Sequence, residues 1–174
     1  ITHFKPQNML TIQKKSLKAG KFVNTSYVDS IIRTYKQERW AHNSARIGKE
    51  DSLSTWYSIE ELEEFINTAK MHGADGIKFY FAAYPADFTE NPEYAGRQTL
   101  ALVATKSKEM ETGTGHKDVY IRDGETTTIL AYNFGKICPP NCPVPPKPKD
   151  ADADDWGGIG ITIVDRGENG LTIV

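Results

Sequence analysis

The sequence predicts an α+β fold, in which an antiparallel sheet of about five or six strands carries two main helices on one face. Three observations predict it. The stretch 56–85 has the signals of one helix followed at once by one strand, a second helical pattern lies at 24–40, and several strand patterns follow residue 97. At 174 residues the chain is long enough to bury the core of a single domain, so we treat 1–174 as one unit.

The helix after Tyr57 has a start signal, an apolar stripe and a stop signal. Ser58 and Glu61 have the spacing of a capping box, and Tyr57 and Leu62 stand at the two positions of a hydrophobic staple. Gly73 follows the last turn, where a left-handed residue closes a helix at low cost. The apolar stripe consists of Ile59, Leu62, Phe65, Ile66 and Ala69.

A strand follows this helix after the Asp75-Gly76 turn and stops at Pro85. Its aromatic and apolar composition predicts a buried strand at the centre of the fold. Because side chains alternate along a strand, one face should pack on the helices and the other is mixed. The first face carries Ile77, Phe79, Phe81 and Ala83, and the second carries Lys78, Tyr80, Ala82 and Tyr84.

The N-terminal quarter predicts a second amphipathic helix. Asn24-Thr25-Ser26 supplies capping residues, and the stripe that follows ends near Trp40. Residues 9–17 fit a short helix or an edge strand equally well. The polar segment 41–55, which contains Gly48, predicts a loop. The stripe is made of Val28, Ile31, Ile32 and Tyr35.

Strand patterns occupy the middle of the chain. Residues 98–105 alternate as a strand, and 106–117 predict a polar, flexible connection with a hairpin or loop tip at 112–117. The segments 118–122 and 125–134 flank Asp123-Gly124, which favours a two-residue hairpin turn.

The C-terminal part differs in composition. Six prolines between 139 and 148 and four aspartates after them predict a semi-rigid, solvated linker at 137–155. Residues 159–174 predict a pair of strands. Because this tail is rich in β-branched residues, we expect it to pair with the main sheet rather than stay exposed.

The stretch 56–85 and the strand at 98–105 also carry a resemblance. The motifs Trp-Tyr-Ser-Ile-Glu-Glu-Leu at 56–62, Gly-Ile-Lys-Phe-Tyr-Phe-Ala-Ala-Tyr-Pro at 76–85 and Thr-Leu-Ala-Leu-Val-Ala-Thr at 99–105 resemble a family of small bacterial proteins of unknown function. About a third of the chain is involved. The resemblance implies a shared core and brings no activity with it.

Metal and cofactor chemistry finds little support in the sequence. Cys138 and Cys142 fit free thiols, a small disulfide or half of a zinc site, and we expect free thiols before the other two. The four histidines stand singly, so we predict no metal site. Asp150–Asp154 imitates the start of a calcium loop but lacks its glycine and its glutamate. Residues 112–117 lack the spacing of a phosphate-binding loop, and we predict no cofactor.

Two groups of residues are candidates for binding. Arg33, Lys36, Arg39 and Trp40 form a basic patch with one aromatic on a helix flank, which suits an acidic partner. Tyr80, Tyr84 and Arg97 could line a shallow pocket for an anion. The ordinary alternatives are a solvated helix flank and tyrosines that cover a half-buried sheet.

Charge is unevenly distributed along the chain. Residues 1–50 carry ten Lys/Arg and three Asp/Glu, whereas residues 51–174 carry eleven and twenty. This asymmetry permits an acidic partner at the N-terminal end, and it equally permits attraction between the two parts. No membrane-spanning run, no signal peptide and no nucleic-acid motif is visible in the sequence, so we expect a cytoplasmic protein without a membrane or nucleic-acid partner.

The absence of a catalytic constellation favours a non-catalytic interaction or accessory module that binds another macromolecule. The alternative is a small enzyme or anion-binding domain that uses the face carrying Tyr80, Tyr84 and Arg97. Whether that face is open or covered separates the two hypotheses.

Overall fold

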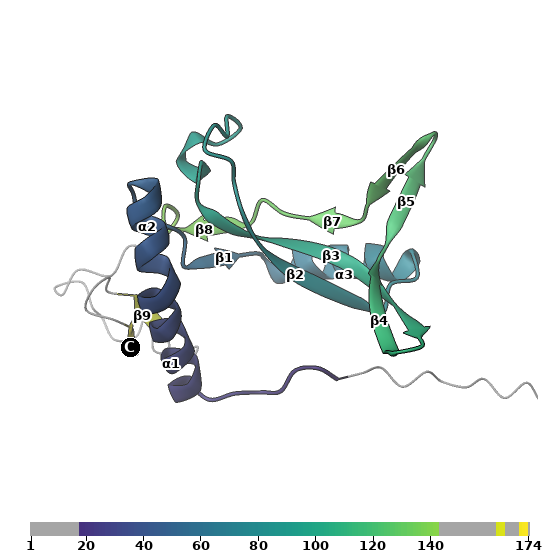
Figure 1. Ribbon diagram of the computed structural model, residues 1–174, viewed down its shortest axis with the longest axis horizontal. Helices are drawn as coiled ribbons and strands as arrows, with labels where there is room; N and C mark the ends of the chain where they lie inside the picture. The colour runs from purple at the N-terminus through teal and green to yellow at the C-terminus, as the bar shows by residue number, and fades with distance from the viewer. Residues whose placement is uncertain (1–17, 143–162, 166–170, 174) are drawn as a thin grey trace, which may run out of the picture.

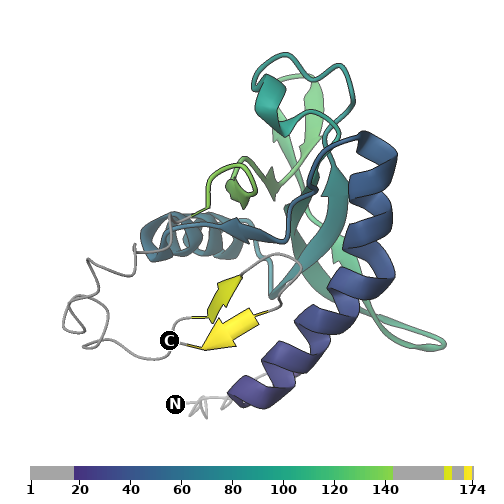
Figure 2. The ribbon, with the colours of Figure 1, turned by 90° about the vertical axis from the view of Figure 1, so that its left-hand side faces the viewer.

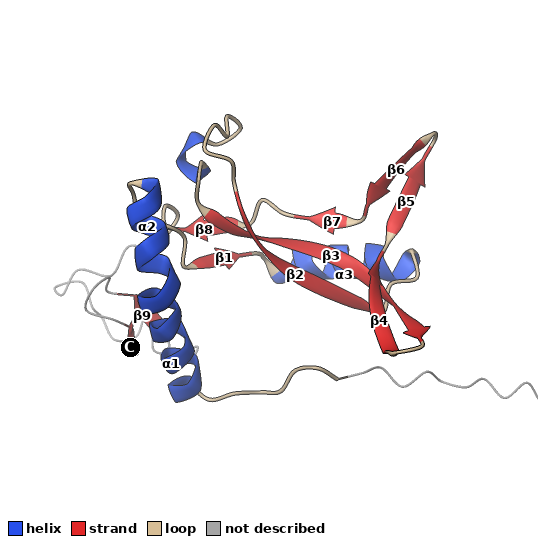
Figure 3. Ribbon diagram, in the orientation of Figure 1, coloured by secondary structure: helices blue, strands red, loops and turns tan. Residues whose placement is uncertain are grey.

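A computed structural model describes residues 18–142, 163–165 and 171–173 of the chain. The fold is α+β with antiparallel strand pairing, as the sequence predicts (Figures 1 and 3). The helical segments are α1 (Thr25–Tyr35), the π-helical η1 (Lys36–Trp40), α2 (Ala41–Ile47), α3 (Ile59–Met71) and the short 3₁₀ turn η2 (Pro92–Tyr94). The strands are β1 (Ser54–Trp56), β2 (Gly76–Ala83), β3 (Gln98–Met110), β4 (Gly113–Asp118), β5 (Tyr120–Asp123), β6 (Thr126–Ile129), β7 (Ala131–Tyr132), β8 (Lys136–Cys138), β9 (Ile163–Asp165) and β10 (Leu171–Ile173).

The strands of the described part divide into one larger sheet and three ladders. The larger sheet has the order β2-β3-β4, and β7 also pairs with β3. Three two-stranded ladders join β1 to β8, β5 to β6, and β9 to β10. Long β3 is therefore the central strand, because it has neighbours on both sides, while β2 has β3 alone.

Helix α3 begins as its local sequence predicts. The Ser58 hydroxyl accepts from the Glu61 N–H at 3.1 Å, and the Glu61 carboxylate accepts from the Ser58 N–H at 2.8 Å. The hydrogen bond from the Ser58 N–H lowers the pKa of Glu61, because it favours the ionised carboxylate. Gly73 takes a φ of +77° just beyond the helix. The capping box and the stop signal are thus confirmed.

Loss of the cap should destabilise the domain measurably. We expect Ser58→Ala to lower the free energy of unfolding by about 1 kcal/mol, since the Glu61 N–H loses its acceptor at the helix start. Ser58→Thr keeps the hydroxyl and serves as the control. The measurement is the midpoint of urea denaturation, and equal midpoints for Ser58→Ala and the parent chain would contradict the assignment.

The main core lies between α3 and the larger sheet. Phe65 and Ala69 of α3 are buried together with Leu102 and Ala104 of β3 and with Leu130. Tyr57 and Leu62, the two expected staple residues, pack against the same core. A second, aromatic cluster forms where the chain leaves β2 and reaches η2, and it consists of Tyr84, Tyr94, Ile137 and the partly buried Phe88.

The expectation of a buried β2 is wrong. Phe79 and Phe81 lie on the face that packs on α3 elsewhere, since they pair with Leu102 and Leu100, yet their exposed fractions are 56% and 84%. An edge strand has a neighbour on one side alone, and α3 covers the part of the face near Ile77. Edge position is a property of the whole sheet, which a local pattern does not reveal.

The N-terminal helix is longer than predicted. Its cap is Asn24, whose side chain accepts from the Tyr27 N–H at 2.9 Å. The helix passes through η1 and continues as α2 to Gly48, which has a φ of +71°. The expectation of a loop at 41–55 is therefore wrong over 41–47, and also at 54–55, which begin β1. In Figures 1 and 2 this long helix and α3 lie apart, toward opposite ends of the sheet.

The connection expected at 106–117 is largely a strand pair. β3 runs to Met110 and pairs with β4, so 112–117 belongs to a hairpin rather than to a phosphate-binding loop. The second hairpin, β5–β6, is confirmed with a small shift. Asp123 pairs with Thr126, which places Gly124 and Glu125 in the turn, and Gly124 takes a φ of +58°.

The linker expected at 137–155 does not begin at Ile137. That side chain has no exposed surface, and its residue pairs with Thr55 in the β1–β8 ladder. The linker's remainder from 143 onward, with the calcium-like aspartates, lies outside the described residues. Strands β9 and β10 confirm the C-terminal pair, but within the described part they pair with each other and not with the larger sheet.

Candidate functional site

The predicted basic patch is divided by the structure. Lys36 is buried at the π-helical turn, and its ammonium lies 5.6 Å from the centre of the Trp40 ring. The Trp40 indole N–H donates to the Asp51 backbone carbonyl at 2.8 Å. Of the four expected binding residues, Trp40 therefore holds the helix against the following segment, and Lys36 lies against the Trp40 ring.

The two arginines of the patch stay exposed. Arg33 Nε lies 2.8 Å from the Asp29 carboxylate one turn earlier, and this contact raises the pKa of Arg33. Arg39 donates to the backbone carbonyl of Glu38 at 2.9 Å. An exposed pair at this helical spacing contributes little to stability and leaves the guanidinium accessible. Acidic-partner binding at Arg33 and Arg39 stays a prediction.

The three residues of the expected anion pocket have separate surroundings. Tyr84 is buried and donates to the Asn133 side chain at 2.8 Å, and burial raises its pKa. Arg97 is buried and donates to the backbone carbonyls of Glu93 and Glu50. Tyr80 is 43% exposed and lies beside Lys78. Arg97 and Tyr84 therefore stabilise the fold through internal partners, and no observation favours an anion bound among the three.

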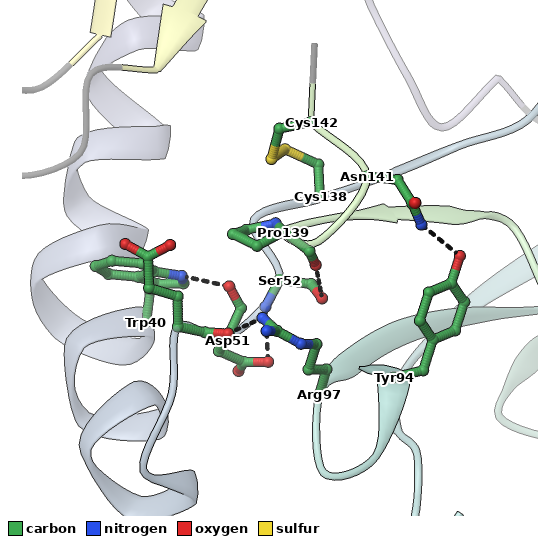
Figure 4. The surroundings of a disulfide bond; sticks show 10 residues. Trp40, Asp51, Ser52, Tyr94, Arg97, Cys138, Pro139, Asn141 and Cys142 are labelled. Atoms are coloured by element: carbon green, nitrogen blue, oxygen red, sulfur yellow. Dashed lines mark hydrogen bonds between the residues drawn. A yellow bond between two sulfur atoms is a disulfide. The ribbon is translucent and has the colours of Figure 1, made fainter. Parts of the chain in front are cut away.

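The structure contains a buried polar cluster around Asp51 that the sequence did not predict (Figure 4). The Asp51 carboxylate accepts from the Ser52 N–H at 2.7 Å and from the Gln98 N–H at 2.6 Å, and both Asp51 and Ser52 are almost fully buried. The Asp51 N–H in turn donates to the Ser44 hydroxyl of α2 at 2.9 Å. This cluster joins α2, the start of β3 and the approach to β1.

Cys138 and Cys142 form a disulfide, so the expectation of free thiols is wrong. The bond lies directly beside the Asp51 cluster: the Leu53 N–H donates to the Cys138 carbonyl at 2.7 Å, and the Ser52 hydroxyl donates to the Pro139 carbonyl at 3.1 Å. In the part of the chain that the structure describes, no group of three or more His, Cys, Asp or Glu side chains is arranged to hold a metal ion.

One open cleft is basic. It lies beyond the C-terminal end of α3 and has a volume of about 360 Å³. Asp118, one of its lining residues, contacts the Lys78 ammonium at 2.8 Å. A helix C-terminus carries partial negative charge, which works against an anion at this place. Its lining consists of His72, Lys106, Ser107, Lys108, Lys117, Asp118 and Val119.

The most distinctive surface of the described chain is apolar, and we call it the edge surface. It consists of Phe79 and Phe81 on β2 and of Tyr27 and Ile31 on α1, with exposed fractions between 49% and 84%. An open groove of about 260 Å³ separates α1 from the sheet beside it. Its apolar lining includes Ile31, Ile32, Leu53, Phe81 and Leu100.

Exposed aromatic side chains that neighbour one another are typical of binding surfaces, because each one buries a large apolar area once it is covered. The sequence contained the signal in the two phenylalanines two residues apart, but their alternation with polar residues indicated the core. The structure places them at the rim of the sheet instead.

Comparisons with known proteins give no relative from which a role could be taken. No family model, no curated protein and no solved structure matches this chain. Within the described residues, no helix is long and apolar enough to cross a membrane.

Proposed function

We propose that this protein is a non-catalytic interaction module, and that its partner protein docks on the edge surface. The observation that carries the proposal is the exposure of Phe79 and Phe81, at 56% and 84%, on a sheet face whose other part packs on α3. Covering apolar surface contributes about 25 cal/mol per Å², so two phenylalanines with flanking α1 residues can anchor a partner. This apolar surface replaces the basic flank as the proposed centre of binding.

The burial of three residues that were predicted to bind a ligand supports this choice. Lys36, Tyr84 and Arg97 are buried and form internal contacts, so a ligand would have to break these contacts to reach them. The side chains of the edge surface need no such rearrangement. Arg33 and Arg39 lie on the same helical segment as Ile31 and can add charge near the rim of the interface.

We propose a non-reducing compartment in place of the cytoplasm. The Cys138–Cys142 disulfide supports this, because disulfides form and persist in oxidising environments and are uncommon in reducing ones. The resemblance to small bacterial proteins suggests a bacterial source for such a module.

Site-specific photo-crosslinking in the native host tests the docking surface. Phe81 is replaced by the photo-crosslinking amino acid p-benzoylphenylalanine, and Tyr120, an aromatic of comparable exposure at 61% on β5, is replaced in the control. We expect one discrete adduct from position 81 and none of the same mass from position 120.

The adduct must then be reproduced with purified components. The captured protein should bind the purified parent chain and should lose binding to Phe81→Ser, while Tyr120→Ser binds normally. Equal binding of both variants, or the same adduct from both positions, would contradict the proposed surface.

A further inference from the structure

Within the described residues, the outer edge of β2 has no strand paired with it. Among the described strands β2 pairs with β3 alone, over its whole length of eight residues. It contains no proline and one charged residue, Lys78. The Lys78 ammonium lies 2.8 Å from Asp118 of β4. This lysine therefore points across the sheet, away from the free edge, where its charge would discourage strand pairing. An edge strand of this kind accepts a further strand readily.

The hydrogen-bonding groups at this edge can be identified. Just beyond the ends of the ladder, the Tyr84 N–H donates to the carbonyl of Arg97, the residue before β3, at 2.9 Å and in register with the β2–β3 pairing. In an antiparallel pair, successive residues turn their N–H and C=O alternately toward the partner and away from it. By that alternation, the backbone groups of Phe79 and Phe81 point to the free edge, where the side chains of the same residues are exposed.

We propose that β2 pairs antiparallel with β2 of a second copy of this chain, across a two-fold axis at Tyr80. This inference rests on the proposed function and names the partner. In this register, Phe79 of one subunit lies opposite Phe81 of the partner subunit, and the reverse pair forms by symmetry. Both exposed phenylalanines are thereby paired on the same face.

The self-pairing places no two like charges directly opposite each other. Lys78 lies opposite Ala82 of the partner subunit, so the two lysines do not face each other. Residues opposite in an antiparallel pair point to the same side, so registers centred on Phe79, Tyr80 or Phe81 all keep the apolar face intact. The register at Tyr80 is the one that makes two phenylalanine pairs rather than one. An isologous contact of this kind closes on itself and gives a dimer without further growth.

A single cysteine at the axis tests the register in the purified full-length chain. Tyr80→Cys places two thiols opposite each other, at a Cα separation of about 4.5–5.5 Å that a disulfide can bridge. Lys78→Cys is the matched control, because its own symmetry mate lies roughly 13 Å away along the strand direction. Under mild oxidation we expect a covalent dimer from Tyr80→Cys and none from Lys78→Cys.

The dimer itself is measured by sedimentation equilibrium over a wide range of concentrations. We expect a mass that rises toward that of two chains for the parent, and a mass of one chain for Phe81→Lys and for Phe79→Lys. Tyr120→Lys, with its charge on another ladder, should dimerise like the parent. Circular dichroism of the lysine variants should match the parent, since both phenylalanines are exposed in a single subunit.

The outcomes separate this inference from the proposed function. A parent chain that stays monomeric, or a dimer that persists in both lysine variants, overturns the pairing of β2 with a second copy. Covalent dimers from Phe79→Cys or Phe81→Cys but not from Tyr80→Cys overturn the register. A monomeric parent that nevertheless forms the specific adduct at position 81 keeps the docking surface with another partner, whereas absence of both results overturns the two proposals together.

Discussion

Replacing Asp51 by alanine is expected to lower the free energy of unfolding by about 3 kcal/mol. The carboxylate accepts from the N–H groups of Ser52 and Gln98, and the residue is 2% exposed. Without it, the buried Ser52 N–H and the part-buried Gln98 N–H lose their acceptor, and an unsatisfied buried donor costs about 1–3 kcal/mol. The effect is measured by urea denaturation with two independent probes.

Asp51→Asn is the control for this prediction, because its side-chain oxygen can still accept both hydrogen bonds. We expect it to retain most of the stability that Asp51→Ala loses. A loss below about 0.5 kcal/mol for Asp51→Ala, the size of an ordinary surface substitution, would show that the cluster does not hold α2 and the start of β3 together.

Replacing Ile137 by alanine is expected to cost about 2–5 kcal/mol, the range for truncation of a fully buried aliphatic side chain. Ile137 has no exposed surface and belongs to the cluster with Tyr84 and Tyr94. Ile129→Ala is the matched control, since the same truncation at a side chain that is 39% exposed should cost far less. Equal losses for the two variants would mean that 136–138 behaves as part of a linker after all.

Much of the fold was predictable where the signals are local. The start of α3 depends on Ser58 and Glu61 alone, and the β5–β6 hairpin depends on a glycine at the turn, so both follow from a few neighbouring residues. The continuation of the N-terminal helix to Ile47 was not predictable in this way. It is accompanied by contacts from Trp40 and Ser44 to Asp51, which local propensity does not include.

The candidate site was less predictable, because the exposure of its residues depends on contacts that are distant in the sequence. The pattern of Phe79 and Phe81 is that of a core face, and their exposure follows from the position of β2 at the edge of the sheet and from the extent of α3. Arg97 was predicted as a binding residue because it is cationic and lies near Tyr80 and Tyr84 in the sequence. Its burial depends on carbonyl groups at Glu50 and Glu93, of which one lies 47 residues away.

Amide hydrogen exchange of β2, followed residue by residue by NMR at low and high protein concentration, tests the central claim most directly. Pairing with a second copy places the Phe79 and Phe81 N–H groups in hydrogen bonds, so their exchange should slow as concentration rises. The amide of Ile129 on β6 should exchange at the same rate in both samples, and Phe81→Lys should abolish the concentration dependence at Phe79. Exchange at Phe79 and Phe81 that is equally fast at both concentrations, while sedimentation detects dimers, would contradict pairing through the edge of β2.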